Sequence, residues 1–230
     1  MSQPALDIRI IPVTPFQQNC SLVWDRESKK GVLIDPGGEA EKILHGVKKH
    51  GVDVEAIWLT HGHLDHAGGA MDVKAALDTP IIGPHKDDQF WMEQIEASWA
   101  KYGQAGMGKD CQSDRYLKDG ETLSIGDTVF DVIHTPGHTP GHVVFYNKDM
   151  HIAFVGDVLF KGSVGRTDFE RSNHKDLIDS ITQKLWPLGN ETRFICGHGP
   201  TGSFGEERRT NPFVGDNVVG QSQGRTSGIM

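Results

Sequence analysis

Cysteine is scarce in this chain, whose 230 residues include three copies, Cys20, Cys111 and Cys196. They are odd in number, lie far apart and form no CxxC pair, so a disulfide framework is not expected. Such sparse use of cysteine fits a reducing compartment. We predict that the three thiols are small buried residues without a catalytic role.

Long apolar runs and an excess of positive charge are missing as well. No stretch approaches the roughly 18 apolar residues of a membrane span, and the opening MSQPALDIRIIPVTPF lacks the features of an export signal. Lys and Arg total 23 against 31 Asp and Glu, which gives a formal net charge of -8. On average this charge repels nucleic acid and anionic membranes. We therefore expect a soluble, cytoplasmic protein that binds neither.

Short apolar runs rich in β-branched and aromatic residues recur along the chain and end at polar or histidine-rich loops. They are 31–38, 55–63, 129–138, 151–157 and 192–199. Apolar residues at helical spacing predict helices between them, over 39–51 and 174–189. Because several runs lie too close together for crossover helices, we predict a mixed α/β (α+β) fold whose sheets have antiparallel parts and are covered by helices.

The chain shows no internal repeat and no interior linker. Its length is within the range that α/β proteins reach as one domain, and we assign that domain to residues 1–213. The remainder, 214–230, is rich in Gly, Ser and Gln and lacks periodicity. This composition predicts a flexible tail.

Histidine and aspartate are concentrated in 60-THGHLDHAGG-69, at the end of an apolar run. Imidazole nitrogen and carboxylate oxygen are donors that zinc accepts. Because side chains alternate along an extended segment, His61 and His63 point the same way and can hold one ion. Asp65 and His66 follow a turn and can face a second ion. We interpret the loop as a metal site; a solvated turn is the alternative.

Three further candidates, His138, Asp157 and His198, each follow an apolar run of strand length. Side chains at the ends of neighbouring strands converge on one edge of a fold. Together with the loop they supply five histidines and two aspartates. This set suffices for three histidines on one ion, one aspartate and two histidines on the other, and an aspartate that bridges both.

The order HxHxDH, then H, then D, then H resembles the pattern of the metallo-β-lactamase superfamily. Four other segments share the resemblance: 33-LIDPGG-38, 135-TPGHTPGHVVF-145, 156-GDVLFKGSVGRTDF-169 and 197-GHGP-200. It covers residues 7–213 and extends to the short, single-domain glyoxalase II-like (hydroxyacylglutathione) hydrolases. The resemblance implies an αββα sandwich with the metals at the edge between two sheets.

Residue by residue, the resemblance implies a ligand set for two divalent ions. Its members are His61, His63 and His138 for the first ion, Asp65, His66 and His198 for the second, and Asp157 as the bridge. Asp35, in the Asp-Pro-Gly turn, resembles the family's carboxylate that supports the ligands. Zinc is the expected metal, with iron or manganese as alternatives.

The activity implied by the resemblance is hydrolysis of thioesters such as S-lactoylglutathione. Two ions would lower the pKa of a bridging water to roughly 7, and the hydroxide would attack while Asp65 orients it. A persulfide dioxygenase with a single iron is an alternative, because that group has the same histidines and a segment like 165-GRTDF-169. A hydrolase of lactones or other esters is another.

Three other classes are disfavoured. Flavodiiron-type relatives carry glutamate where His63 stands, and true β-lactamases lack a bridging carboxylate at the position of Asp157. A protein that only buffers metal needs no open site with a bridging aspartate. The resemblance thus favours an enzyme with a small-molecule substrate and leaves the oligomeric state open.

Substrate contacts follow the family less closely. Glyoxalase II has a glutathione-binding lysine nine positions after the bridging aspartate, where this chain has Arg166, a cation suited to a carboxylate. Asp168 and Pro200 stand where that family has tyrosines, and little chain follows Asn211 to form its C-terminal helical domain. We therefore expect Arg166 to bind substrate but do not expect tight recognition of glutathione.

Two groups of residues remain without an assigned role. The aromatic stripe of segment 85–103 predicts packing or a subunit contact, with a lid over the site as the alternative. His134 and His142 flank a ligand and can support it, although surface or hydrogen-bonded core positions are the favoured interpretation.

Overall fold

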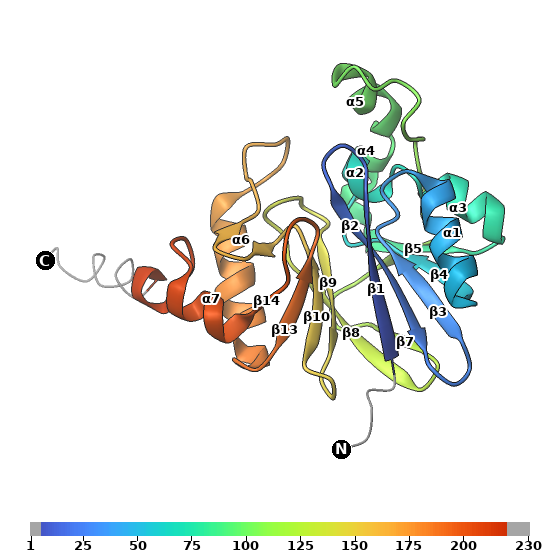
Figure 1. The fold of residues 1–230 in the computed structure, drawn as a ribbon. Helices are drawn as coiled ribbons and strands as arrows, with labels where there is room; N and C mark the ends of the chain where they lie inside the picture. The colour runs from blue at the N-terminus through green and yellow to red at the C-terminus, as the bar shows by residue number, and fades with distance from the viewer. Residues whose placement is uncertain (1–5, 220–230) are drawn as a thin grey trace, which may run out of the picture.

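Two mixed β-sheets face each other in the computed structural model, which describes residues 6–219 (Figure 1). The first sheet has the order β1 (Leu6–Val13), β2 (Gln18–Asp25), β3 (Lys30–Ile34), β4 (Asp53–Trp58), β5 (Ile81–His85) and β6 (Arg115–Leu117). The second has the order β14 (Gly202–Ser203), β13 (Arg193–Cys196), β10 (Ile152–Gly156), β9 (Val143–Asn147), β8 (Thr128–His134) and β7 (Thr122–Ile125). A small ribbon pairs β11 (Leu159–Phe160) with β12 (Ser163–Val164).

Helices lie outside both sheets. Those associated with the first sheet are α1 (Ala40–His50), α2 (Leu64–Ala67), α3 (Ala70–Leu77), η1 (Lys86–Asp88), α4 (Gln89–Met92) and α5 (Ile95–Lys101). Those of the second are α6 (His174–Asp179), which continues into η2 (Ser180–Leu185) and η3 (Trp186–Leu188), and α7 (Phe204–Thr210). In Figure 1, α1 and α3 cover the outer face of the first sheet, and α6 and α7 cover that of the second.

The connections explain the mixed strand directions. Strands β3, β4, β5 and β6 pair in parallel, as do β10 and β13, and helices connect them. Parallel neighbours need such crossovers. Strands β7, β8, β9 and β10 follow one another as antiparallel neighbours. The closely spaced runs at 129–134, 142–146 and 151–155 are therefore antiparallel, as predicted.

Three apolar layers hold the sandwich together. Trp58, Phe130 and Phe145 are among the residues buried between the two sheets. A second cluster packs α1, α3 and α5 on the first sheet, and a third packs α6, η2 and α7 on the second. Residues buried on both faces of both sheets confirm the αββα sandwich.

Segment 85–103 is broken into short pieces. Residues Glu93 and Gln94 separate α4 from α5, so the aromatic residues predicted as one stripe point in different directions. Ile95 and Trp99 are fully buried in the core, whereas Trp91 is half-buried and lines a cavity. The packing role holds for Ile95 and Trp99, whereas Trp91, Ser98 and Lys101 of the same segment line the cavity.

Packing continues beyond the predicted end of the domain at residue 213. Val214 is fully buried, and its carbonyl accepts a hydrogen bond of 3.3 Å from Trp186 Nε1. Arg208 pairs with Asp216 at 3.0 Å. The tail predicted for 214–230 therefore begins too early, because an apolar side chain at 214 completes the core of the second sheet. Residues 220–230 lie outside the described part of the chain.

A membrane-spanning segment is not found in the described range, where each helix is too short or too polar to cross a bilayer.

Candidate metal centre

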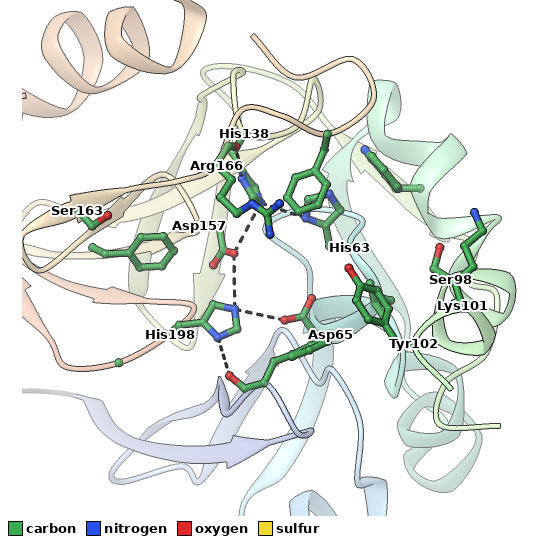
Figure 2. A pocket seen from close by; sticks show the side chains of 16 residues that line it. His63, Asp65, Ser98, Lys101, Tyr102, His138, Asp157, Ser163, Arg166 and His198 are labelled. Atoms are coloured by element: carbon green, nitrogen blue, oxygen red, sulfur yellow. Dashed lines mark hydrogen bonds and ion pairs between the residues drawn. The ribbon is translucent and has the colours of Figure 1, made fainter. Parts of the chain in front are cut away.

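The predicted ligands meet at one edge of the sandwich (Figure 2). His61 and His63 follow β4, and Asp65 and His66 lie on the short helix α2. The others come from the second sheet: His138 from the β8–β9 connection, Asp157 from the end of β10 and His198 from the end of β13. Strand ends from both sheets therefore supply the set, which the sequence places in separate segments.

The first group contains only histidines. One ring nitrogen from each of His61, His63 and His138 lies within 4.8 Å of the other two. His63 Nδ1 is 3.1 Å from His61 Nε2 and 3.0 Å from His138 Nε2. All three side chains are buried. Three nitrogens that converge in this way suit one face of a tetrahedral metal site.

The second group lies beside the first. Asp65, His66 and His198 each offer one ligand atom within 4.8 Å of the other two. His198 Nε2 is 3.2 Å from Asp65 Oδ2. His66 is fully buried, whereas His198 is partly exposed, so this triad opens toward solvent.

Asp157 lies between the two groups. Its Oδ2 is 3.6 Å from His138 Nε2 of the first triad and 3.6 Å from His198 Nε2 of the second. Its Oδ1 is 3.3 Å from His66 Nε2. One carboxylate therefore faces both triads, the position that a bridging ligand requires.

Backbone carbonyls orient two of the rings. His138 Nδ1 donates to the carbonyl of Arg166 at 2.8 Å, and His198 Nδ1 donates to that of Phe16 at 3.0 Å. Each bond assigns the proton to Nδ1 and leaves a lone pair on Nε2, directed at the cluster.

Asp35 orients the ligands on the opposite side. Its Oδ2 accepts a hydrogen bond from His66 Nδ1 at 2.9 Å, and its two oxygens accept from the Thr60 hydroxyl and backbone N–H at 2.6 and 2.7 Å. The Thr60 hydroxyl in turn accepts from His61 Nδ1 at 3.0 Å. Asp35 also lies close enough to His61 and His66 to form a third candidate triad. Because its oxygens are already used by Thr60 and His66, we assign it a supporting role.

Burial and charge set the protonation of the cluster. Burial lowers the pKa of His61 and His63 well below the usual range, so both rings are neutral at neutral pH and able to bind a cation. Burial also favours neutral His66, but Asp157 and Asp65 raise its pKa well above the usual range. Although burial opposes ionisation of Asp157, the facing histidines hold its pKa well below the usual range. The second triad thus gathers negative charge that a proton or a metal ion can balance.

Two observations indicate that the residues fit metal ions. His66 Nε2 and Asp157 Oδ1 are not aligned for a hydrogen bond with each other and have no other partner within residues 6–219. Buried polar atoms of this kind are rare. A Cβ atom on Gly197 would lie 2.0 Å from Asp157 Oδ1 and 2.5 Å from His66 Cε1, so these groups occupy the space that any other residue would need.

Two residues behind the ligands were missed or undervalued by the sequence analysis. His142 is fully buried, stacks on His61 with ring centroids 4.8 Å apart, and its Nε2 accepts the N–H of Asp157 at 3.1 Å. It therefore supports ligands, the role that was not favoured. Asp88 is also fully buried and accepts bonds from Gly62 N–H and the Thr139 hydroxyl at 2.9 and 2.7 Å. In the sequence, Asp88 is marked only by being an acidic residue shortly after a strand.

No cysteine belongs to the candidate triads of residues 6–219, although Cys196 Sγ donates to the backbone carbonyl of His198 at 3.0 Å. Cys20, Cys111 and Cys196 are buried and unpaired, as predicted. Burial raises the pKa of Cys111 and of Cys196 to about 12, so neither is a thiolate at neutral pH.

A cavity of about 660 Å³ opens over the cluster. Trp91, Ser98, Lys101 and Tyr102, from α4, α5 and the residue that follows, form one wall. Phe160, Ser163, Arg166 and Phe169 form the other. His63, Asp65, His138, Asp157 and His198 are exposed to it. The ligand cluster is therefore accessible to a small molecule.

An αββα sandwich with one triad of histidines and one of aspartate and histidines at the edge between its sheets is an arrangement suited to a metal-dependent hydrolase. A family model of the metallo-beta-lactamase superfamily matches residues 13–198. The hydroxyacylglutathione hydrolase GloC of Haemophilus influenzae is 42% identical over 209 residues, which are 91% of this chain and 98% of that protein. The probable metallo-hydrolase YqgX of Bacillus subtilis is 35% identical over 90% of this chain and 96% of its own. The chain belongs to the metallo-beta-lactamase superfamily.

Solved structures agree with this assignment. A crystal structure of the BLEG-1 B3 metallo-beta-lactamase has a TM-score of 0.84 and 34% identity, and covers 90% of this chain and 99% of its own. The protein TTHA1623, crystallised in a di-iron-bound form, has a TM-score of 0.81 and 40% identity, with coverage of 89% and 99%. ETHE1 from Myxococcus xanthus, at 24% identity and a TM-score of 0.74, shares the fold.

Proposed function

We propose that this protein is a thioesterase that hydrolyses S-lactoylglutathione or a smaller thioester of the same kind. The observation that carries the proposal is Asp157, whose carboxylate lies within 3.6 Å of histidines from both triads. The 42% identity to a hydroxyacylglutathione hydrolase supports the choice of thioester. When bound, two divalent ions supply Lewis acidity and a hydroxide nucleophile at neutral pH.

Asp65 is the residue that orients the attacking water. Its side chain lines the cavity, and its Oδ2 lies 3.2 Å from His198 Nε2. A carboxylate in this place accepts a hydrogen bond from water and directs the oxygen toward a carbonyl carbon in the cavity. Trp91, Phe160 and Phe169 surround that carbonyl with aromatic surface, which limits the access of bulk water.

Arg166 contributes less to substrate binding in this proposal than the sequence alone suggests. It lines the cavity, but its Nε and one terminal nitrogen already donate to Asp168 at 2.9 and 2.8 Å. This bidentate pair neutralises the charge that a substrate carboxylate would otherwise meet. Asp168 stands where glyoxalase II has a tyrosine, so the departure changes charge as well as shape.

The metals we propose for this site are two zinc ions, held by the seven predicted ligands. Imidazole and carboxylate donors suit zinc, but they also suit iron and manganese. The related protein TTHA1623 was crystallised in a di-iron-bound form, which makes iron the first alternative.

We place the protein in the cytoplasm with a small-molecule substrate. Three buried, unpaired cysteines support a reducing compartment. The net charge of -8 disfavours nucleic acid and anionic membranes as partners.

The test is thiol release from S-lactoylglutathione and from lactoyl-N-acetylcysteamine, by protein loaded with zinc, iron or manganese. We expect turnover of at least one thioester that a chelator abolishes and added metal restores. Oxygen uptake with a persulfide, together with one iron per chain, would instead establish the dioxygenase. Turnover confined to lactones, other esters or β-lactams would reject the thioesterase and identify the class of ester or amide.

A further inference from the structure

Each wall of the cavity carries one cation, and the two cations differ in whether a carboxylate already pairs with them. Arg166 is held by Asp168 on one wall, and its guanidinium also lies 4.6 Å from the centre of the Phe169 ring. An anion that approaches Arg166 therefore also approaches the carboxylate of Asp168. This wall has a cation but little net attraction for a carboxylate.

The opposite wall has a cation without such a partner. Lys101 lies in the last turn of α5 and lines the cavity, and within residues 6–219 it forms no ion pair. Ser98, one turn earlier, and Tyr102, the next residue, line the same wall and each carries a hydroxyl group. Figure 2 shows the three across the cavity from Asp157 and Ser163. One ammonium and two hydroxyls form a group of donors that suits a carboxylate.

The position of this group is fixed by packing. Trp99, between Ser98 and Lys101, is fully buried and stacks on Phe16 with ring centroids 5.4 Å apart. The rings of Phe16 and Tyr102 also pack edge to face, with ring centroids 5.4 Å apart, and the Phe16 carbonyl accepts a hydrogen bond from His198. The last turn of α5 is thus held against the same loop that orients a metal-site histidine.

The chemistry of the substrate decides which part reaches this group. In a lactoyl thioester the acyl part is small and uncharged, so any carboxylate belongs to the thiol part. We propose that Lys101, with Ser98 and Tyr102, binds a carboxylate of the thiol portion and selects thioesters of anionic thiols. The inference rests on the proposed function and gives this chain a recognition element within its own sandwich, where Asp168 weakens the contribution of Arg166.

The experiment compares Lys101→Ala with the parent on two thioesters, S-lactoylglutathione and the neutral lactoyl-N-acetylcysteamine. We expect KM for the anionic substrate to rise about five- to tenfold with kcat unchanged. A loss of this size lies between the binding contribution of an exposed ion pair and that of a charge-assisted hydrogen bond. KM for the neutral substrate should change less than twofold. Lys101→Arg should restore most of the loss, because it restores the charge.

Lys49→Ala is the matched control. Lys49 also lies in the last turn of a helix and is exposed, but it is in α1, away from the cavity. Both substitutions remove one charge that favours a helix C-terminus, and the control should leave both substrates unaffected. Equal losses on the two thioesters in Lys101→Ala, or an unchanged KM for the anionic one, would overturn the proposal.

A binding measurement separates this inference from the proposed function. Titration of the parent with S-methylglutathione, which has no thioester to hydrolyse, should give a dissociation constant about five- to tenfold lower than that of Lys101→Ala. The difference should shrink at high salt, because the ammonium is exposed. If the parent hydrolyses neither thioester, the proposed function fails while this titration still decides the role of Lys101. Equal dissociation constants in the two proteins would reject that role.

Discussion

At the residue scale, the site depends on how each ligand is oriented by a neighbour. His138 and His198 donate to backbone carbonyls, and His66 donates to Asp35. These bonds leave one lone pair per ring directed at the cluster, which is the arrangement that raises affinity for a metal. The clustering of these histidines and aspartates was predictable because their spacing forms a recognisable pattern. Of their partners, Asp35 was expected from the resemblance, whereas the carbonyls of Arg166 and Phe16 were not predictable, because every residue carries a backbone carbonyl.

Asp65→Asn tests the orientation of the attacking water. The amide is nearly isosteric but carries no charge and accepts a hydrogen bond less strongly, so we expect kcat on a thioester to fall by about 10²- to 10⁴-fold. The far-ultraviolet circular dichroism spectrum should stay that of the parent. Metal content is measured in parallel to separate ligand loss from loss of orientation. A turnover number equal to that of the parent would remove Asp65 from this role.

Gly197→Ala tests the close packing of the cluster. The added methyl group would lie 2.0 Å from Asp157 Oδ1 and 2.5 Å from His66 Cε1, far inside contact distance. We expect metal content and kcat to fall by more than about tenfold, since two ligands must shift to make room. Gly46→Ala is the control, because its methyl group meets the movable end of Ile11 in a different part of the fold. Full metal occupancy in Gly197→Ala would show that the ligands have more freedom than the distances imply.

At the element scale, loops that follow strands bring the two halves of the site together. Runs such as 31–38 and 129–138 predicted strands correctly because their apolar residues match a buried sheet. The hairpin of β1 and β2 was not predicted. In β1 three of eight residues are buried, and Pro12 lies within the strand, so its pattern is weak. Segment 85–103 was misjudged as one stripe because periodicity does not reveal the break at Glu93 and Gln94.

Asp88 connects two of these loops. It accepts the Gly62 N–H between two ligands, and it accepts the Thr139 hydroxyl and the Gly141 N–H beside a third. Burial raises the pKa of Asp88 to about 6, although the three bonds favour its ionised form. The carboxylate is therefore ionised at neutral pH and takes up a proton in the folded protein before it would do so in the unfolded chain.

Asp88→Asn tests how the stability difference between parent and variant changes with pH. Because the pKa of Asp88 in the folded protein, about 6, lies above the usual value for an aspartate, the folded state loses stability relative to the unfolded chain as pH rises through about 6. The parent should thus gain about 1 kcal/mol relative to Asp88→Asn when pH falls from 7.5 to 5. Urea unfolding of both proteins, each stripped of metal, measures this difference. The free energy of unfolding of the parent minus that of the variant should be larger at pH 5. An equal or smaller difference at pH 5 would contradict the raised pKa of Asp88.

At the scale of the whole molecule, three apolar layers fix two sheets so that their ends meet at one edge. Composition and strand spacing predicted a mixed fold, and the resemblance supplied the αββα arrangement. The cavity walls were less predictable, because they depend on how α5 packs through Trp99 and on the pairing of Arg166 with Asp168. The packing of Trp99 against Phe16 joins distant parts of the chain, whereas Arg166 and Asp168 are two residues apart and their pairing depends on the conformation of their loop. The domain end was also missed, since burial of Val214 depends on a distant tryptophan.

We propose that the carboxylate of Asp157 would help to hold both divalent ions of the site. This central claim is tested most directly by mass-spectrometric metal content together with turnover of S-lactoylglutathione, in the parent and in Asp157→Ala. Asp127→Ala, which removes an exposed carboxylate in a turn between β7 and β8, is the control. We predict two metal equivalents per chain in the parent and in the control. In Asp157→Ala we predict at most one, with turnover reduced by more than about 10²-fold. Two equivalents and normal turnover in Asp157→Ala, or one iron per chain in an active parent, would contradict the account.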